Sequence, residues 1–409
     1  MNNKTDYSDF EYPSDGSVSG VLGILTKSHS IPDFEGLRAN AMRRAEKYAL
    51  QNEAVKLLPD QRVRFCLKHR IDAGKAVAVR YNERTSQAHY SNLQRCGSIW
   101  LCPVCAAQIS EGRRSELSQA IKHFCTVSEG SVYLLTLTNA HHHGDNLAAL
   151  LSGQAKALKY LWGDRKSFEK FSSLNKIGHI TCTEVTHGNK NGWHPHFHIL
   201  LFFAQKIDEK SLQSFIAGHW QHCCKKAGLK IPSLQHGCDL RGGAYAEQYI
   251  AKWGLENEMT KGHLKKGKDG SNTPWDLLRL SEEGCTMSGY LFQQYAKAFK
   301  GKRQLSWSRG LKLLLLVEEA TDEELATDTE QNSIEVKLIA LEIWRLIKRY
   351  NVRADFLKAV EMDIIDGYSR ADDLVMEIAR KHVEQNIDEV MKNNDVGAFG
   401  AYGALSLID

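Results

Sequence analysis

The stretch GWHPHFHILLFF at residues 192–203 constrains the fold more than any other part of the chain. Its histidines alternate with apolar residues, and it ends in the apolar run ILLFF. Alternation with period two is typical of a β-strand, and a continuous apolar run is typical of a strand buried on both faces. We therefore predict a strand from which His196 and His198 project on one face, while Phe197 and Ile199 pack on the other.

A second strand-like run, ITCTEVTH, precedes this strand, and the turn-forming residues GNKNG separate the two. We predict a β-hairpin centred near residue 190, which places Glu184 opposite His196 on the histidine face. A shift of one residue would move Glu184 to the other face. Two imidazoles and a carboxylate suit a divalent ion with open coordination positions, which can act as a Lewis acid on a phosphate or carbonyl oxygen. Alternatively, the histidines are surface residues of an exposed strand face.

Other histidines near this strand are less specific. His194 shares the parity of the pair but lies at the turn end, where a phosphate contact or a plain surface position competes with metal ligation. The run from His141 to His143 follows another strand-like segment, GSVYLLTLTN. We expect that run to lie in a solvated loop, with binding of phosphate or metal as the alternative.

The segment GAYAEQYIAKW at residues 243–253 has the pattern of a helix. Tyr245, Tyr249, Lys252 and Glu256 recur at steps of three and four residues and so share one face. A tyrosine beside an ammonium group has its anionic form favoured, and it becomes a nucleophile where a metal ion polarises a phosphate. Alone, the segment fits an amphipathic helix with aromatic core residues better. The histidine pair upstream favours the nucleophile.

Together, HPHFHILL and the later YIAKW resemble motifs of the HUH endonuclease superfamily, and specifically of the plasmid rolling-circle replication initiators. Three further segments are similar to that family: SVYLLTLT at residues 131–138, CGSIWLCPVCAAQI at residues 96–109, and TPWDLL at residues 273–278. The resemblance covers roughly residues 60–315 and does not extend to either end.

This resemblance implies an α+β fold in which a five-stranded antiparallel sheet is flanked by helices. It implies that His196 and His198 hold a catalytic ion beneath the scissile phosphate of plasmid origin DNA, single-stranded or in a cruciform at the nick. Tyr249 would attack that phosphate, leaving a 5′-phosphotyrosine and a 3′-OH that a host polymerase extends with a host helicase, and Lys252 would serve the phosphate or the tyrosine. We expect the ion to be Mg²⁺ or Mn²⁺, with the imidazoles favouring Mn²⁺.

One position departs from the family's pattern. Relatives often place a second acid or tyrosine four residues from the first tyrosine, for the closing step, and here that position is Trp253. Tryptophan can stack on a base but cannot attack a phosphate. Termination would then use Tyr245, the Tyr249 of a second subunit, or a water activated by Glu247 or Glu256.

Four cysteines precede these motifs: Cys66, Cys96, Cys102 and Cys105. A Cys-x-x-Cys knuckle with two further thiolates suits tetrahedral Zn²⁺ in a closed structural site. His69 could replace Cys66, and unliganded buried thiols or redox chemistry are the alternatives. We expect the six other cysteines of the ten to be small buried core residues: Cys125, Cys182, Cys223, Cys224, Cys238 and Cys285.

A chain of 409 residues is long enough for at least two domains. Changes in composition and periodicity along the chain predict six segments. They are a flexible arm at 1–35, a helical and cysteine-rich segment at 36–125, the endonuclease domain at 126–315, an acidic linker at 316–331, a helical domain at 332–392, and a loose tail at 393–409.

The charge of the chain is distributed unevenly, although its net value is only +4. Basic runs at 261–268 and 300–312 could hold DNA phosphates, with Trp307 available for stacking, or could be solvated surface. No run approaches the ~18 apolar residues of a membrane span, so we expect a cytoplasmic protein without a membrane partner and leave its oligomeric state open. The alternative functions are an HUH transposase or relaxase, and a non-enzymatic zinc-ribbon protein that binds nucleic acid.

Overall fold

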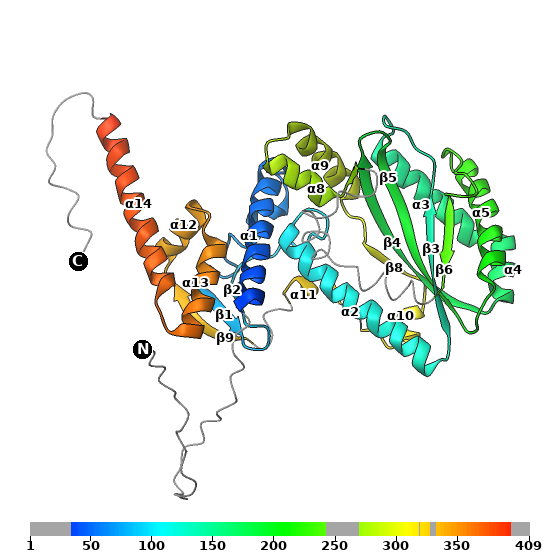
Figure 1. Ribbon diagram of the computed structural model, residues 1–409, viewed down its shortest axis with the longest axis horizontal. Helices are drawn as coiled ribbons and strands as arrows, with labels where there is room; N and C mark the ends of the chain where they lie inside the picture. Colours follow the sequence, from blue (N-terminus) through cyan, green and yellow to red (C-terminus); the bar gives the residue numbers. More distant parts are fainter. Residues whose placement is uncertain (1–33, 243–269, 319, 328–332, 394–409) are drawn as a thin grey trace, which may run out of the picture.

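Buried hydrophobic side chains form three clusters in the molecule. Two lie on opposite faces of a large antiparallel sheet, and the third lies mainly in the part of the molecule away from that sheet. The computed structural model describes residues 34–242, 270–318, 320–327 and 333–393. Figure 1 shows the large sheet at one end of an elongated molecule and the carboxy-terminal helices at the other.

The large sheet has six strands: β3 (Ser131–Thr138), β4 (Lys176–Gly188), β5 (Gly192–Phe203), β6 (Cys238–Arg241), β7 (Ser271–Asn272) and β8 (Leu305–Trp307). Their order is β6-β3-β5-β4-β7, and β8 also pairs with β4. Every pairing is antiparallel. The histidine-bearing strand β5 is therefore central, between β3 and β4, and the predicted combination of antiparallel sheet and flanking helices is confirmed.

The prediction of five strands is wrong, because the sheet is completed by two very short strands. β7 contains 2 residues and β8 contains 3, and a period-two pattern cannot be recognised over such lengths. β7 pairs with β4 beside the hairpin turn, and β8 pairs farther along. In β8, Leu305 and Trp307 pack against the cluster that contains Ile180, so long-range packing specifies this strand.

Different helices cover the two faces of β5. Its odd-numbered apolar residues share a cluster with residues of α3 (Leu147–Gly163) and α5 (Glu209–Lys226). The even-numbered Leu200 and Phe202 share another with residues of α2 (Pro103–Val127) and α10 (Leu311–Leu314). The even-numbered face is thus apolar in the second half of β5. In the first half the same face carries the histidines.

Local sequence fixes where several helices begin. The side chain of Asn146 accepts a hydrogen bond from the backbone N–H of Ala149 at the start of α3. Asp164 caps α4 (Arg165–Ser173) and Asp208 caps α5 in the same way. Asparagine and aspartate suit this position because their oxygens satisfy backbone donors that the first helical turn leaves unpaired. No helix in the described ranges is long and apolar enough to cross a membrane.

The third cluster joins both ends of the described chain. Around it lie α1 (Phe34–Leu57), η1 (Arg62–Phe65), β1 (Val77–Asn82), β2 (Gln87–Ser91), α8 (Pro274–Glu282), α9 (Thr286–Phe299), α11 (Asp322–Thr327), β9 (Ile334–Ile339), α12 (Leu341–Arg349), α13 (Arg353–Asp366) and α14 (Arg370–Asn393). Trp344 and Phe356 of the carboxy-terminal helices are buried in it with Leu50 of α1. The two ends of the described chain therefore share one core.

Strand β9 completes a small three-stranded sheet with the amino-terminal hairpin. It pairs antiparallel with β1, giving the order β2-β1-β9. The sequence predicted a helical region at 332–392, and residues 334–339 of that region form this strand instead. The segment predicted as an acidic linker contains α11, which packs against α2 through Leu325 beside Gly112. Packing against distant segments specifies both elements.

Candidate metal centre and cysteine cluster

Strands β4 and β5 form the predicted hairpin in the predicted register. Gly188 pairs with Gly192 across the turn, and Glu184 pairs with His196. Because side chains two residues apart share a face of a strand, Glu184 faces the same side of the sheet as His196 and His198. The structure therefore brings together the three residues that the sequence predicted as ligands of a catalytic ion.

The donor atoms of these three side chains converge. Nε2 of His196 and Nε2 of His198 each lie 3.4 Å from Oε2 of Glu184. All three potential ligand atoms lie within 4.8 Å of one another. Ligands of one octahedral ion with bonds of about 2.1 Å lie roughly 3 to 4 Å apart. The arrangement of His196, His198 and Glu184 therefore fits a single divalent ion and leaves room for further ligands.

The other ring nitrogens of both histidines have partners that orient the rings. Nδ1 of His196 lies 3.3 Å from the carbonyl oxygen of His194, to which it can donate. Nδ1 of His198 lies 3.0 Å from the hydroxyl oxygen of Thr136 on β3. A histidine that donates from Nδ1 presents the lone pair of Nε2 to a metal. Thr136 could not be recognised from local sequence patterns, because its role depends on the pairing of β3 with β5.

The electrostatics of the centre favour an ionised carboxylate. Burial alone would raise the pKa of Glu184, but the neighbouring His198 and His196 outweigh burial and lower that pKa well below its usual value. Without an ion, hydrogen bonds from both imidazoles to Glu184 act in the same direction. Glu184 is thus held as an anion, which is the form that binds a metal ion.

His194 lies beside the centre without joining it. Its Nδ1 is 3.5 Å from Nδ1 of His141, and the two rings are 4.7 Å apart between centroids. Burial lowers the pKa of His194 to about 4, and His196 and His141 act in the same direction. His141 is half-buried against this ring, whereas His142 and His143 are exposed as expected for a solvated loop. The sequence missed the contact between His141 and His194.

The tyrosine and lysine predicted for catalysis, Tyr249 and Lys252, lie outside the described residues, as do Tyr245, Glu247, Trp253 and Glu256. The described chain stops at residue 242, next to β6, and resumes at residue 270, next to β7. β6 lies at one edge of the strand order and β7 at the other, with β5 between them.

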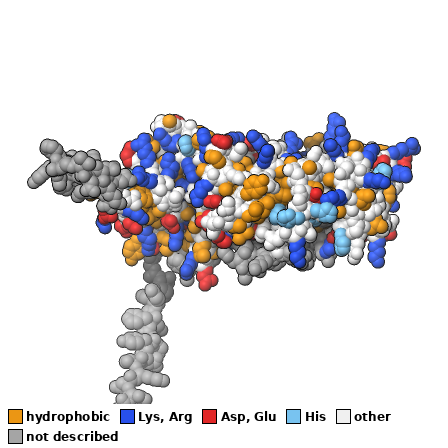
Figure 2. Space-filling view, turned by 90° about the horizontal axis from the view of Figure 1, so that it is seen from above, with side chains coloured by type: hydrophobic (Ala, Val, Ile, Leu, Met, Phe, Trp, Pro, Cys, Tyr) orange, Lys and Arg blue, Asp and Glu red, His pale blue; other side chains and the backbone are white. Residues whose placement is uncertain are grey.

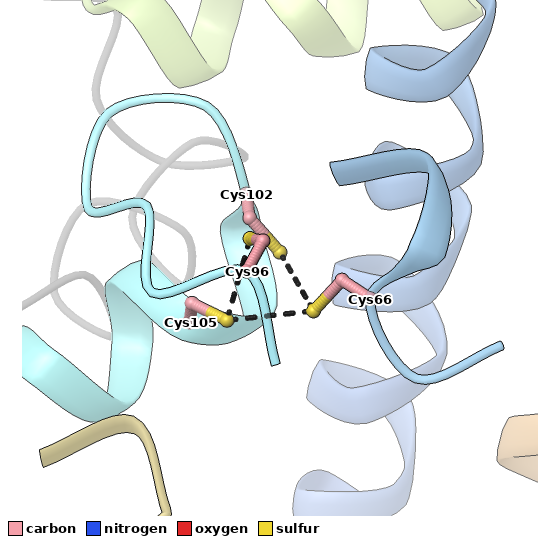
Figure 3. Close-up of side chains that lie close together, drawn as sticks. All are labelled: Cys66, Cys96, Cys102 and Cys105. Carbon is pink, nitrogen blue, oxygen red and sulfur yellow. Dashed lines mark hydrogen bonds between the residues drawn. The ribbon is translucent and has the colours of Figure 1, made fainter. Parts of the chain in front are cut away.

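The four predicted zinc ligands also come together, in the other part of the molecule (Figure 3). Cys66 follows η1, Cys96 lies in the loop after β2, Cys102 precedes α2, and Cys105 lies in its first turn. Each is at most 5% exposed. His69 is not in the group; its ring packs edge-on against Phe65.

The spacing of the four sulfur atoms matches a tetrahedral zinc site. The Sγ atoms lie 3.4 Å apart for Cys66 and Cys105, 3.6 Å for Cys96 and Cys105, and 3.7 Å for Cys66 and Cys102. Zinc–sulfur bonds of about 2.3 Å place the sulfurs of a regular tetrahedron about 3.8 Å apart. A disulfide would require about 2.05 Å. The cluster therefore fits a metal ion bound by four thiolates.

The other six cysteines are divided between core and surface. Burial raises the pKa of the thiol to about 11 in Cys223 and to about 12 in both Cys224 and Cys238. Cys182 is also buried, so these four are the small core residues that we expected. Cys125 and Cys285 are exposed instead.

One expected nucleic-acid contact near the sheet, stacking on Trp307, is not supported by the structure. Figure 2 shows histidine side chains beside hydrophobic ones on one face, with lysine and arginine side chains spread around them. The ring of Trp307 packs partly buried against the sheet, with Nζ of Lys312 5.4 Å from its centroid. It is therefore less available for base stacking than the sequence suggested. The basic run at 261–268 lies outside the described residues.

Comparison with known families assigns the chain. The family model described as "Replication protein" matches residues 91–353, a range that contains the hairpin and three of the four clustered cysteines. The chain belongs to this family. The resemblance to plasmid replication initiators of the HUH superfamily is therefore confirmed.

Curated relatives of this replication protein include two with the same description. "Protein rep" of Streptomyces lividans is 28% identical over 317 residues, which cover 61% of the chain and 68% of the relative. "Protein rep" of Lentilactobacillus hilgardii is 29% identical over 129 residues, which cover 31% of the chain and 39% of the relative. "Neomycin resistance protein" of Streptomyces cyanogenus is 30% identical over 184 residues, which cover 39% of the chain and 38% of the relative. No solved structure matches the replication protein significantly.

Proposed function

We propose that this replication protein starts rolling-circle replication by cutting one strand of its plasmid origin with Tyr249. The observation that supports the proposal is the convergence of Glu184, His196 and His198 on one face of the central hairpin. These side chains are only partly covered, with 30%, 14% and 17% of their surfaces exposed. A phosphate can therefore approach an ion held by them.

The proposed reaction is a transfer of the phosphate from DNA to tyrosine. A bound Mg²⁺ or Mn²⁺ supplies Lewis acidity toward a non-bridging oxygen of the scissile phosphate. The phenol oxygen of Tyr249 forms a bond to phosphorus and loses its proton, while the bond from phosphorus to the 3′ oxygen breaks and that oxygen takes up a proton. The products are a 5′-phosphotyrosine and a free 3′-OH. The reverse reaction rejoins the displaced strand.

The chain's own residues have distinct parts in this scheme. Glu184, His196 and His198 hold the ion, and Thr136 and the backbone of residue 194 orient the imidazoles. Lys252 contacts the phosphate or favours the phenolate of Tyr249. The partners are origin DNA, the host polymerase that extends the 3′-OH, and a host helicase that separates the strands.

We also propose that Cys66, Cys96, Cys102 and Cys105 bind a structural Zn²⁺. Complete burial of the cluster supports a closed site, with no coordination position left for a substrate. Contacts with the sulfurs of Cys102, Cys105 and Cys66 raise the pKa of Cys96. A divalent cation would reverse this effect, because it favours the deprotonated thiolates.

The test of the nuclease is a denaturing gel of the full chain with single-stranded origin DNA, in Mn²⁺ or in EDTA. We expect a covalent protein–DNA adduct in Mn²⁺ only. Tyr249→Phe removes the nucleophile and His198→Ala removes an ion ligand, so both should abolish the adduct while DNA binding persists. His382→Ala changes a histidine on α14 and should leave adduct formation intact.

Each other outcome has a definite meaning. An adduct in Tyr249→Phe would assign the nucleophile to another residue, with Tyr245 next in order. Binding of a verified origin without any adduct would favour the non-enzymatic zinc-ribbon alternative. Cutting of a transfer or transposon-end sequence, with the origin left intact, would favour a relaxase or transposase.

A further inference from the structure

A guanidinium group is buried close to the cysteine cluster. Arg353, the first residue of α13, is only 2% exposed. Its Nη1 donates to Oε1 of Gln51 and to the carbonyl oxygen of Leu67, both at 3.0 Å. Its Nη2 donates to Oδ1 of Asn52 at 3.2 Å. All three acceptors are neutral, so these hydrogen bonds do not neutralise the charge of Arg353.

The charge of Arg353 is not compensated by a carboxylate nearby. Within the ranges that the structure describes, Arg353 forms no ion pair with aspartate or glutamate. Instead, its Cζ lies 4.7 Å from the ring centroid of Tyr48. An isolated charge in a protein interior costs several kcal/mol, so buried charges are ordinarily paired. A nearby anion would therefore stabilise the buried guanidinium of Arg353.

Two of its contacts lead directly to the cysteines. Gln51 accepts from Arg353 through Oε1. Its Nε2 lies 3.4 Å from Sγ of Cys102 and can donate to it. Leu67, whose carbonyl accepts from Arg353, is the residue after Cys66. Gln51 itself is fully buried. A chain of hydrogen bonds thus connects the guanidinium to one sulfur and to the backbone beside another.

We propose that Arg353 is a counter-charge of the zinc site and that Gln51 transmits its position to Cys102. The inference depends on the zinc proposed above and is independent of the nuclease chemistry. Zn²⁺ with four thiolates carries a net charge of −2, and burying such a group is costly without nearby positive charge. The buried dianion and the buried guanidinium each supply what the other lacks. Arg353 is therefore a positioning residue of the metal site.

This arrangement gives the carboxy-terminal helices a part in a site whose ligands are all amino-terminal. The hydroxyl of Tyr90 on β2 donates to the carbonyl oxygen of Arg353 at 2.9 Å and fixes the start of α13. Zinc binding and the docking of α13 should therefore stabilise each other, as any two events that share an interaction must. A loss of zinc should loosen α13, and a loss of Arg353 should weaken zinc binding.

The test measures the zinc content of the purified full chain and the affinity for Zn²⁺ by competition with a chelator. Arg353→Gln keeps a hydrogen-bonding side chain without the charge, and we expect it to lower the affinity at least about tenfold. Arg353→Lys keeps the charge and should recover part of the loss. Arg349→Gln changes an exposed arginine near the end of α12 and should have no effect.

A spectroscopic readout separates charge from general stability. With Co²⁺ in place of Zn²⁺, the sulfur-to-cobalt charge-transfer band should shift in Arg353→Gln and return toward its normal position in Arg353→Lys. Gln51→Leu breaks the connection without removing the arginine and should lower zinc affinity by a smaller factor. This variant keeps the test available if Arg353→Gln does not fold.

The failures can be told apart. A wild-type chain with reduced cysteines that holds no zinc would overturn both the zinc assignment and the role of Arg353. Wild-type zinc affinity and an unshifted cobalt band in folded Arg353→Gln, or wild-type affinity in Gln51→Leu if Arg353→Gln does not fold, would overturn the role of Arg353 alone. None of these measurements involves DNA cleavage, so a failure of the proposed nuclease leaves the result unaffected.

Discussion

The hydroxyl oxygen of Thr136 lies 3.0 Å from Nδ1 of His198, its cross-strand partner. This contact links β3 to the candidate metal centre and fixes which nitrogen of His198 faces Glu184. Partners of this kind orient a metal-binding histidine, and their loss typically costs 10- to 100-fold in metal affinity. The hydroxyl of Thr136 should therefore increase the affinity of the centre for a metal ion.

Thr136→Val should weaken Mn²⁺ binding about tenfold with little change in folding, because valine has the shape of threonine without the hydroxyl. The measurement is a calorimetric Mn²⁺ titration, supported by the Mn²⁺ dependence of adduct formation. Thr138→Val is the matched control, because Thr138 lies on the same strand and face. Its hydroxyl faces the carbonyl oxygen of His236 and not a metal-binding histidine. Equal Mn²⁺ affinity in the wild type and Thr136→Val would contradict the role of this hydroxyl.

Gly192 should tolerate no side chain. Its φ is +70°, and a Cβ there would lie 2.7 Å from the carbonyl oxygen and 2.8 Å from Cα of His143. These are backbone atoms, so Gly192→Ala should lower the free energy of unfolding by about 1–3 kcal/mol, measured by chemical denaturation. At Gly188, across the same turn, a Cβ would meet nothing within 4 Å. Gly188→Ala should be nearly neutral, and equal losses in both variants would refute this explanation.

Glu361 should be important for joining α13 to the amino-terminal segments. Its carboxylate accepts from Nη1 and Nη2 of Arg44 at 2.6 and 2.7 Å, and from the backbone N–H of Ala88 at 2.7 Å. Both charged side chains are largely buried. Glu361→Gln leaves the guanidinium without a counter-charge and should cost about 3 kcal/mol in the free energy of unfolding.

The matched control for this pair is exposed. Arg165 and Glu169 form an ion pair on α4 with 90% and 58% of their side chains exposed. Glu169→Gln should therefore cost less than about 1 kcal/mol in the same denaturation experiment. If Glu361→Gln is as mild as Glu169→Gln, the pair of Arg44 on α1 and Glu361 on α13 does not hold the two segments together.

The candidate metal centre could be predicted because it depends on local pattern. The turn residues between the two strands fixed the centre of the hairpin, and that centre alone determined that Glu184 faces His196. Thr136 could not be found in the same way. Its contact with His198 requires β3 to pair with β5, and two helices and the strand β4 separate these strands along the chain.

The fold was less predictable where distant segments meet. The run IEVKLI before WRLIKR reads as one continuous apolar periodicity, and only pairing with β1 shows that its first part is the strand β9. Arg353 was equally hidden, because its sequence neighbours give no sign that Gln51 and Leu67 lie against it. Burial of a polar side chain is a property of tertiary structure.

His179 of β4 should make the protein less stable in acid. Its ring stacks on Trp162 at 4.3 Å between centroids, and its Nδ1 lies 3.1 Å from Nζ of Lys176. Burial, together with the charge of Lys176, lowers the pKa of His179 to about 3. The ring is therefore neutral in the folded chain at pH values where it is protonated after unfolding.

The sign of the effect follows from proton uptake on unfolding. Between pH 6.5, the ordinary pKa of histidine, and about 3, the unfolded chain binds a proton at His179 that the folded chain does not, so stability falls as the pH falls. His179→Asn keeps an acceptor for Lys176. Between pH 7 and 4.5, this variant should lose about 2 kcal/mol less of its free energy of unfolding than the wild type loses. Denaturation curves at several pH values measure this difference. His142→Gln removes an exposed histidine and should follow the wild type, whereas a wild-type slope in His179→Asn would show that another group causes the acid sensitivity.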